Sequence, residues 1–426
     1  MANKKTNYRE ILKESGYRKL LVSTLVNRFG DSLDAVAFTW LVYQATHSGA
    51  WSAVIFGLNI LPNVIVQPFA GAYVERLNKK NVIVFTHILR AVLLINFLIV
   101  FVSGNVNGWI MAAFTIAVSS IESFNMPAAT AFIPKVVKKD KLTHAMSFNT
   151  MMSGAVTMIG TALAGVMIAK AGLYSVMITD TATFFIAAFI VLTIDYDAQD
   201  EDSNSISKES YLMTLKEGIR YIRSEPVIIN YCIVAVMLNL LLVPINALQA
   251  PLVSECFRMD SGLLSVIGVA GSIGAILGAS LIPLVSARLS VKKIVIYLGL
   301  ILGSGIVILP MAGGYLQTAS LKYLAAAICF VIMTLSAGLI TGVVNIEFVS
   351  NVDQRYLARS SAVFVALATA SIPVTSMIVG ILKTYLETST LIILCGVSTI
   401  LFILMLMIAD PALDMKKGRL DATETA

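Results

Sequence analysis

The chain has 426 residues, of which 57% are hydrophobic and only 13% are charged, whereas about a quarter of the residues of a soluble domain are charged. This composition excludes an ordinary soluble protein and makes lipid the expected solvent. The net charge of +6 does not indicate nucleic-acid binding, because the basic residues lie in short loops between apolar segments, as in proteins oriented in a membrane.

Twelve apolar segments are long enough to cross the hydrocarbon core, which takes about 20 helical residues. Six lie in the first half of the chain, at 20–44, 51–74, 82–102, 109–133, 145–169 and 173–194. Six lie in the second half, at 227–253, 263–285, 294–312, 323–349, 362–382 and 391–409. The sequence therefore predicts an all-α membrane protein with about twelve transmembrane helices in two halves, 1–194 and 227–426.

The longest polar stretch, 195–226, joins the two predicted halves. It opens with an acidic, Ser-rich run and continues into residues 211–224, where Leu215, Ile219 and Ile222 recur at helical spacing. We predict a cytoplasmic linker that contains a short surface helix.

The Lys and Arg residues fall almost entirely in alternate loops. With the N-terminus inside, about 25 of the 31 basic residues would be cytoplasmic and about 4 would be outside. The four outer ones are Lys170, Arg258, Lys322 and Lys383. This bias places both termini in the cytoplasm and the chain, as a multi-pass protein, in the cell membrane.

The loop after the second span carries a recognisable motif, Gly71-Ala-Tyr-Val-Glu75-Arg76-Leu-Asn-Lys79-Lys80. It resembles the loop 2–3 signature of the major facilitator superfamily, with Glu75 in place of the Asp and Lys79 in place of an Arg. A small residue followed by a basic loop recurs after the eighth span, which is typical of transporters built from two related halves. The resemblance implies the major facilitator fold, with two pseudo-symmetric six-helix halves and the substrate site between them.

Three further features are similar to the macrolide-efflux branch of that superfamily. They are Arg28-Phe-Gly30-Asp31 in the first span, Arg90 in the third, and Pro127-Ala-Ala-Thr-Ala-Phe-Ile-Pro134 in the fourth. This resemblance implies a drug:proton antiporter. The fifth span departs from it, because Thr161 and Ala164 stand where the antiporter motif has Pro and Gly.

The first span carries a polar stripe of Asn27, Arg28, Asp31 and Asp34 at spacings of three and four residues, so all four share one helix face. A charge at mid-bilayer costs about 3 kcal/mol on insertion scales, so such residues need a wet cavity or a partner. Asp31 or Asp34 can take a proton, with Arg28 tuning which one is charged. The alternative is a structural Arg28–Asp31 ion pair. Asp34 is the better proton site, since Arg28 neutralises Asp31 more naturally.

Glu122 lies near the centre of the fourth span, three residues before Asn125. In the resembled fold the first and fourth spans line the same side of the cavity. Glu122 can bind a cationic substrate or share protons with Asp34, and the alternative is an ion pair with Arg90.

The second half offers mainly amides. Asn239 and Asn246 lie seven residues apart on one face of the seventh span, with Gln249 three further on, and either line a cavity or join helices. Glu347, near the cytoplasmic end of the tenth span, is either a gate residue or a carboxylate that reaches toward water.

The Gly71–Lys80 motif suggests a latch. Gly71 would let helices approach closely, while Glu75 and Arg76, with Lys79 and Lys80, would pair with the other half when the cytoplasmic side closes. The alternative is that these charges only set the topology.

No catalytic motif is present: the sequence has no phosphate-binding Gly-Lys-Ser/Thr loop and no His-Glu-x-x-His. We therefore predict a secondary transporter rather than an enzyme, a monomer without a bound cofactor that uses the proton gradient. Its predicted function is efflux of amphipathic, drug-like compounds by alternating access. The alternatives are a lipid, siderophore or metabolite carrier of the same fold, and a non-transporting membrane sensor.

Overall fold

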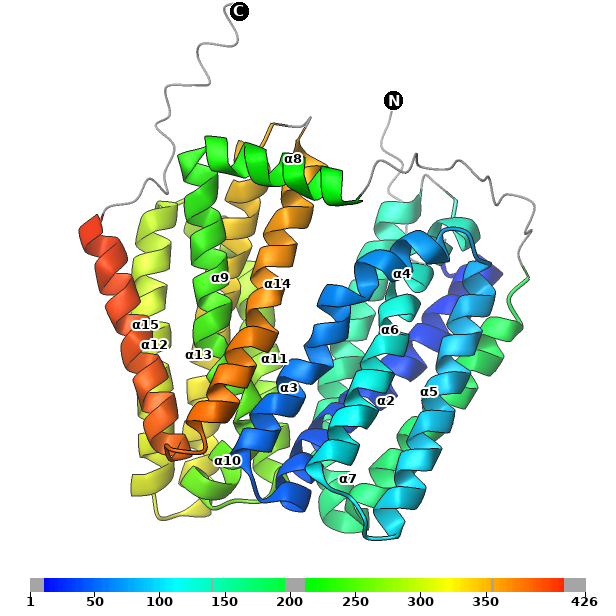
Figure 1. Ribbon diagram of the computed structural model, residues 1–426, viewed down its shortest axis with the longest axis horizontal. Helices are drawn as coiled ribbons and strands as arrows, with labels where there is room; N and C mark the ends of the chain where they lie inside the picture. Colours follow the sequence, from blue (N-terminus) through cyan, green and yellow to red (C-terminus); the bar gives the residue numbers. More distant parts are fainter. Residues whose placement is uncertain (1–10, 139–140, 196–210, 354–355, 410–426) are drawn as a thin grey trace, which may run out of the picture. The chain divides into compact units, whose positions relative to one another are not determined.

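The structure is a computed structural model that describes residues 11–138, 141–195, 211–353 and 356–409 (Figure 1). Every regular element in these residues is a helix, and eight of the helices are long and apolar enough to cross a membrane. The all-α membrane fold is thereby confirmed. The acidic run after Asp195 and the two charged tails, on which part of the predicted orientation depends, lie outside the described residues.

The first six predicted spans correspond to six helices. They are α2 (Ser15–Thr46), α3 (Gly49–Ile65), α4 (Gln67–Val74), α5 (Lys79–Val102), α6 (Gly108–Val136) and α7 (Leu142–Leu192). The second span is divided at Val66, because Pro68 is the second residue of α4 and lacks the N–H that would continue α3. The fifth and sixth spans are both within α7, which bends at Gly172, where φ is 76° and ψ is 170°.

The linker helix and the remaining spans follow in order. They are α8 (Tyr211–Ser224), α9 (Pro226–Ala247), α10 (Gln249–Pro251), the π-helix η3 (Leu252–Phe257), α11 (Ser261–Ser286), α12 (Val291–Tyr315), α13 (Ala319–Asn351), α14 (Leu357–Leu382) and α15 (Thr388–Ala409). The predicted linker helix coincides with α8. The seventh span is shorter than predicted, since the backbone leaves helical geometry at Leu248.

The chain forms two compact units. The first contains residues 1–204 together with 247–269 and 376–384, and the second contains 205–246, 270–375 and 385–426. Two short segments from the second half of the sequence, including η3 and the end of α14, therefore pack within the first unit.

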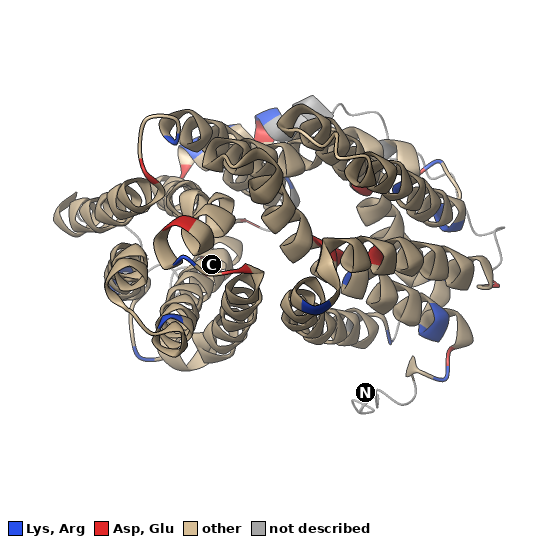
Figure 2. Ribbon diagram, turned by 90° about the horizontal axis from the view of Figure 1, so that it is seen from below, with Lys and Arg blue, Asp and Glu red and all other residues tan. Residues whose placement is uncertain are grey.

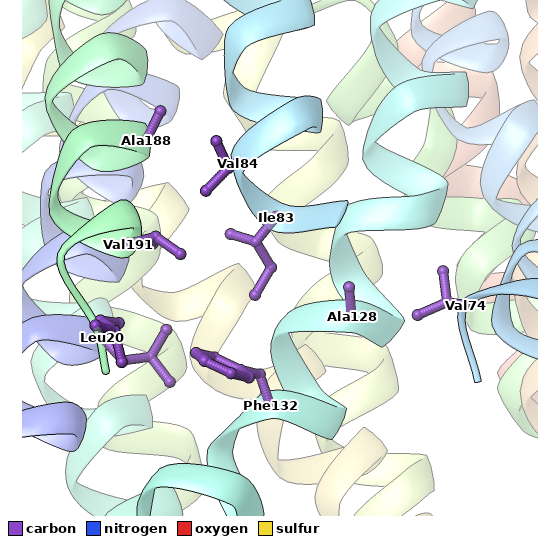
Figure 3. Packing of buried hydrophobic residues seen from close by; sticks show 9 residues of the cluster. Leu20, Val74, Ile83, Val84, Ala128, Phe132, Ala188 and Val191 are labelled. Carbon is purple, nitrogen blue, oxygen red and sulfur yellow. The ribbon is translucent and has the colours of Figure 1, made fainter. Parts of the chain in front are cut away.

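The first unit has a tightly packed apolar core in which five helices meet (Figure 3). Its residues are Leu20 of α2, Val74 of α4, Ile83 and Val84 of α5, Ala128 and Phe132 of α6, and Ala188 and Val191 of α7, with Ile194 just beyond. All are less than a tenth exposed. This core fixes the rotation of α2, α5, α6 and α7, and with it the direction of their polar side chains.

Charged residues are sparse along the ribbon (Figure 2). Two long helices, α2 and α6, with 32 and 29 residues, are not among the eight that qualify as spans by composition. The polar stripe of the first span is on α2, and Glu122 is on α6. Both long helices that fall short of a simple apolar span therefore carry candidate site residues.

Candidate functional site: a buried charge cluster in the first unit

Arg90 of α5 is the centre of a charge cluster. It is 6% exposed, and its Nη2 lies 2.7 Å from Oδ1 of Asp31 on α2. The amide of Asn27, one turn earlier on α2, donates to the other oxygen of Asp31 at 2.8 Å. Asp31 is therefore held on both oxygens, as a buried carboxylate requires.

A second carboxylate approaches the same guanidinium. Oε2 of Glu122 on α6 lies 3.6 Å from Nη2 of Arg90. The Glu122 side chain is 38% exposed, against 16% for Asp31 and 7% for Arg90. The alternative of an Arg90–Glu122 ion pair is therefore present, and the greater exposure of Glu122 leaves room for a second partner.

The guanidinium also lies over an aromatic ring. Cζ of Arg90 is 4.3 Å from the ring centroid of Phe184 on α7, a favourable cation–π distance. His87, one turn from Arg90, faces the same ring at 6.2 Å between centroids. Nε and Nη1 of Arg90 have no hydrogen-bond partner among the described residues. Two of the three guanidinium nitrogens are thus buried and unsatisfied.

The predicted alternative of an Arg28–Asp31 ion pair is wrong. Arg28 is exposed, and Asp31 is paired with Arg90. The reason is electrostatic: Arg90 is buried and needs a carboxylate partner, whereas the exposed Arg28 does not.

Asp34 lies one turn beyond Asp31 on α2 and is half-buried. It makes no hydrogen bond or ion pair within the described part of the chain, and the charges acting on it are those of Asp31 and Arg90. Arg90 is closer to Asp31, so Asp34 is left without a cation of its own. Asp34 remains a candidate for protonation. The cation that neutralises Asp31 is Arg90, and not Arg28 as the sequence spacing predicted.

Asp180 of α7 was not among the residues predicted from the sequence. This carboxyl is 2% exposed, and the charges that act on it are those of Asp34, Asp31 and Arg90. A carboxylate within the apolar sixth span was a signal that could have found it, because ionisable residues inside membrane helices are rare and commonly functional.

Asn125 joins α6 to α5 and does not contact the ion pair directly. Its side-chain oxygen accepts a hydrogen bond from the Thr86 hydroxyl at 3.1 Å. Its role in the described structure is to fix the helix that carries Glu122.

Asn239, Asn246 and Glu347, the candidates of the second half, lie in the second unit. Asn239 donates to the carbonyl of Ala368 at 3.3 Å, which ties α9 to α14. Asn246 is exposed at the end of α9. Glu347 accepts from the Asn351 amide of the same helix at 3.2 Å. The shared helix face predicted for the amides does not extend to Gln249, since α9 ends before it.

The loop motif is partly exposed on the first unit, with Lys79 only 9% exposed. Glu75 and Arg76 are exposed, Nζ of Lys79 donates to the Glu75 carbonyl at 2.8 Å, and Nζ of Lys80 donates to the Ile194 carbonyl at 2.7 Å. The expected close approach at Gly71 is wrong: a Cβ there would meet no atom within 4 Å. The latch to the other half stays a prediction.

Within the described ranges, no group of three or more His, Cys, Asp or Glu side chains is placed to hold a metal ion. The carboxylates of the cluster are arranged around a guanidinium instead. In such an arrangement a proton or another cation can compete with Arg90 for a carboxylate.

Residues 20–376 match the sequence profile of the Major Facilitator Superfamily. The chain belongs to the Major Facilitator Superfamily. It is therefore a membrane transporter, with the fold that the Gly71–Lys80 motif implied.

Relatives within the superfamily are distant. The chain is 23% identical to the uncharacterized MFS-type transporter YfiS of Bacillus subtilis over 95% of both chains. It is 24% identical to the multidrug efflux pump Tap of Mycolicibacterium fortuitum over 61% of this chain and 64% of Tap. It is 21% identical to macrolide efflux protein A of Enterococcus faecalis over 74% of this chain and 96% of that protein.

Solved structures of the same superfamily fold extend over nearly the whole chain. The nucleoside transporter NupG superposes with a TM-score of 0.74 at 12% identity, covering 92% of this chain and 98% of NupG. A bacterial homologue of the iron transporter ferroportin superposes with a TM-score of 0.67 at 14% identity, covering 96% of this chain and all of that one. At these identities the similarity establishes the fold and not the substrate.

Proposed function

We propose that this transporter exports amphipathic, drug-like compounds of the macrolide type in exchange for protons. The observation that carries the proposal is the excess of carboxylates around one cation: Asp31 and Glu122 both contact Arg90, and Asp34 has no cation of its own. A carboxylate without a cation in an apolar bundle either takes a proton or binds a cationic ligand.

The coupling follows from charge balance. When Asp34 and Glu122 are ionised, a cationic amphipathic substrate stabilises them. When they are protonated, that attraction is lost and the substrate is released. Protons entering from the acidic side would therefore favour release on that side. The distant relatives named as multidrug and macrolide efflux proteins support this substrate class.

The test uses inverted membrane vesicles in which respiration generates the proton gradient, with ethidium and erythromycin as probes. We expect uptake of at least one probe that collapses when nigericin dissipates the pH gradient. Uptake that ignores the gradient, or no uptake of either probe, would refute proton-coupled drug export.

The role of Asp34 is tested in the same vesicles with Asp34→Asn. We expect probe uptake to lose its dependence on the pH gradient, because the side chain can no longer take or release a proton. The control is Asp195→Asn, which neutralises an exposed carboxylate at the end of the N-terminal helices. Unchanged coupling in Asp34→Asn would remove this residue from the mechanism.

A further inference from the structure

Asp180 sits directly against the backbone of α2. A Cβ built on Gly30 would overlap Oδ1 of Asp180 and Oγ1 of Thr183. The glycine therefore lets the Asp180 carboxyl lie beside the residue that precedes Asp31. This contact places a second buried carboxyl next to the Asp31–Arg90 ion pair, from the opposite helix.

The position of Arg90 relative to Asp180 follows from helix geometry. Phe184 is four residues after Asp180, so the two side chains lie on the same face of α7 one turn apart. The Arg90 guanidinium lies over the Phe184 ring, and Arg90 is among the charges that act on Asp180. The unsatisfied Nε and Nη1 of Arg90 therefore belong to the cation nearest to the Asp180 face of α7, and no cation forms an ion pair with Asp180 among the described residues.

The Asp180 carboxyl receives little hydrogen bonding. The Thr183 hydroxyl donates to the backbone carbonyl of Asp180 at 2.7 Å and to Oδ1 at 3.3 Å, so one hydrogen is shared between two acceptors. Within the described residues this shared hydroxyl is the only donor to the carboxyl, which leaves an ionised Asp180 poorly stabilised.

Burial also favours the protonated form of Asp180. Asp180 is 2% exposed, and an ionised carboxylate without a contacting cation is strongly disfavoured in such a place. The charged groups that face it are Asp31 and Asp34 from α2 and Arg90 from α5, with His87 of α5 and Glu122 of α6 close to Arg90. One guanidinium cannot neutralise all of these carboxylates.

We propose that Asp180 is a proton-carrying residue of this transporter, protonated while Arg90 is paired with Asp31, and that Arg90 changes partner to Asp180 when the proton moves. In the described state Asp180 is a carboxylic acid and Asp31 is a carboxylate bound to Arg90. In the other state the O–H bond of Asp180 is broken, an O–H bond forms on Asp31, and Arg90 binds the new carboxylate through its free nitrogens. The charge of the cluster is the same in both states.

The exchange would link proton movement to the packing of α2 against α7. Arg90 would leave α2 and bind α7, which weakens one helix contact and strengthens the other. The link to transport rests on the proposed proton-coupled function, whereas the protonation of Asp180 does not.

Protonation is tested first, without any substrate. Infrared spectra of the full-length protein in lipid should contain the C=O stretch of a protonated carboxyl, and Asp180→Asn should remove that band. Thr183→Val should shift the band without abolishing it, because the hydroxyl that donates to Oδ1 of Asp180 is lost. This second variant keeps the test valid if Asp180→Asn does not fold. A band that both variants leave unaltered would overturn the assignment.

Coupling is tested in vesicles with ethidium. Asp180→Asn should retain exchange of ethidium between the two sides at equal pH but lose gradient-driven accumulation. If Asp180→Asn accumulates ethidium normally while the wild type shows gradient-driven accumulation, the role of Asp180 is refuted and the proposed function is not. A wild type that accumulates no probe would refute the proposed function, while the infrared result on Asp180 would still stand.

Discussion

At the scale of single residues, two arginines that both lie in predicted spans differ in their burial and in their partners. Arg28 and Arg90 both fall within predicted spans, but Arg28 is exposed and Arg90 is 6% exposed with two carboxylates near its Nη2. Removing one partner of a buried ion pair leaves an uncompensated charge, which destabilises a protein by about 3–5 kcal/mol. An exposed charge contributes far less.

Arg90→Gln should therefore lower the free energy of unfolding by about 3–5 kcal/mol, because Asp31 would lose its cation inside the bundle. Arg28→Gln, the matched control, should change it by no more than about 0.5 kcal/mol. Chemical unfolding in mixed micelles, followed by tryptophan fluorescence, measures both. Equal losses for the two variants would contradict the pairing that we describe.

At the scale of helices, close packing of α2 on α7 depends on two glycines, one on each helix. A Cβ on Gly30 of α2 would overlap Asp180 and Thr183, and a Cβ on Gly160 of α7 would overlap the Ser32 hydroxyl. Small residues let membrane helices approach closely enough for such polar contacts. Gly160 lies before the bend of α7 at Gly172 and Asp180 lies after it. The contact at Gly30 is therefore the one that holds Asp180 beside α2, and the geometry of the charge cluster depends on it.

We expect Gly30→Ala to destabilise the protein by about 1–3 kcal/mol, the usual effect of overpacking a tight contact. Gly154→Ala on α7 is the control, since a Cβ there would meet nothing within 4 Å and alanine favours helix by up to about 1 kcal/mol. Thermal unfolding of both variants in the same detergent compares their stabilities. A Gly30→Ala protein as stable as Gly154→Ala would show that the α2–α7 contact can relax freely.

At the scale of the whole molecule, the first unit includes segments from both halves of the sequence. Glu255 of η3 accepts from the Tyr43 hydroxyl at 3.1 Å and lies 3.4 Å from Nζ of Lys383, just after α14. The aliphatic part of Lys383 lies against Gly49 at the start of α3. These contacts join α2 and the start of α3 to η3 and to the residue after α14, all within the first unit.

Lys383→Met should loosen this cluster, because Glu255 loses its cation. A partly exposed pair contributes about 1 kcal/mol, which is roughly a fivefold change in an opening equilibrium. Cys256 lies next to Glu255 and is half-buried, so a membrane-impermeant maleimide should label it about fivefold faster in the variant.

Lys170→Met is the control for this labelling, because Lys170 is exposed and predicted to lie on the same side. Cys256→Ala gives the background from other thiols. If Lys383→Met and wild type are labelled at the same rate, the Lys383–Glu255 pair does not hold the segment closed.

The sequence by itself determined the spans, the α8 linker helix at residues 211–224 and the fact that α2 and α6 carry charges in apolar surroundings. These features are local: hydropathy and helical periodicity are properties of a short stretch of chain. Only the tertiary structure decided which charges meet. Arg90 pairs with Asp31 across 59 residues of chain, Asp180 lies against Gly30, and Gly71 has no close neighbour. Such pairings depend on how each helix is rotated, and that rotation is set by core packing between distant segments, which no single stretch of sequence encodes.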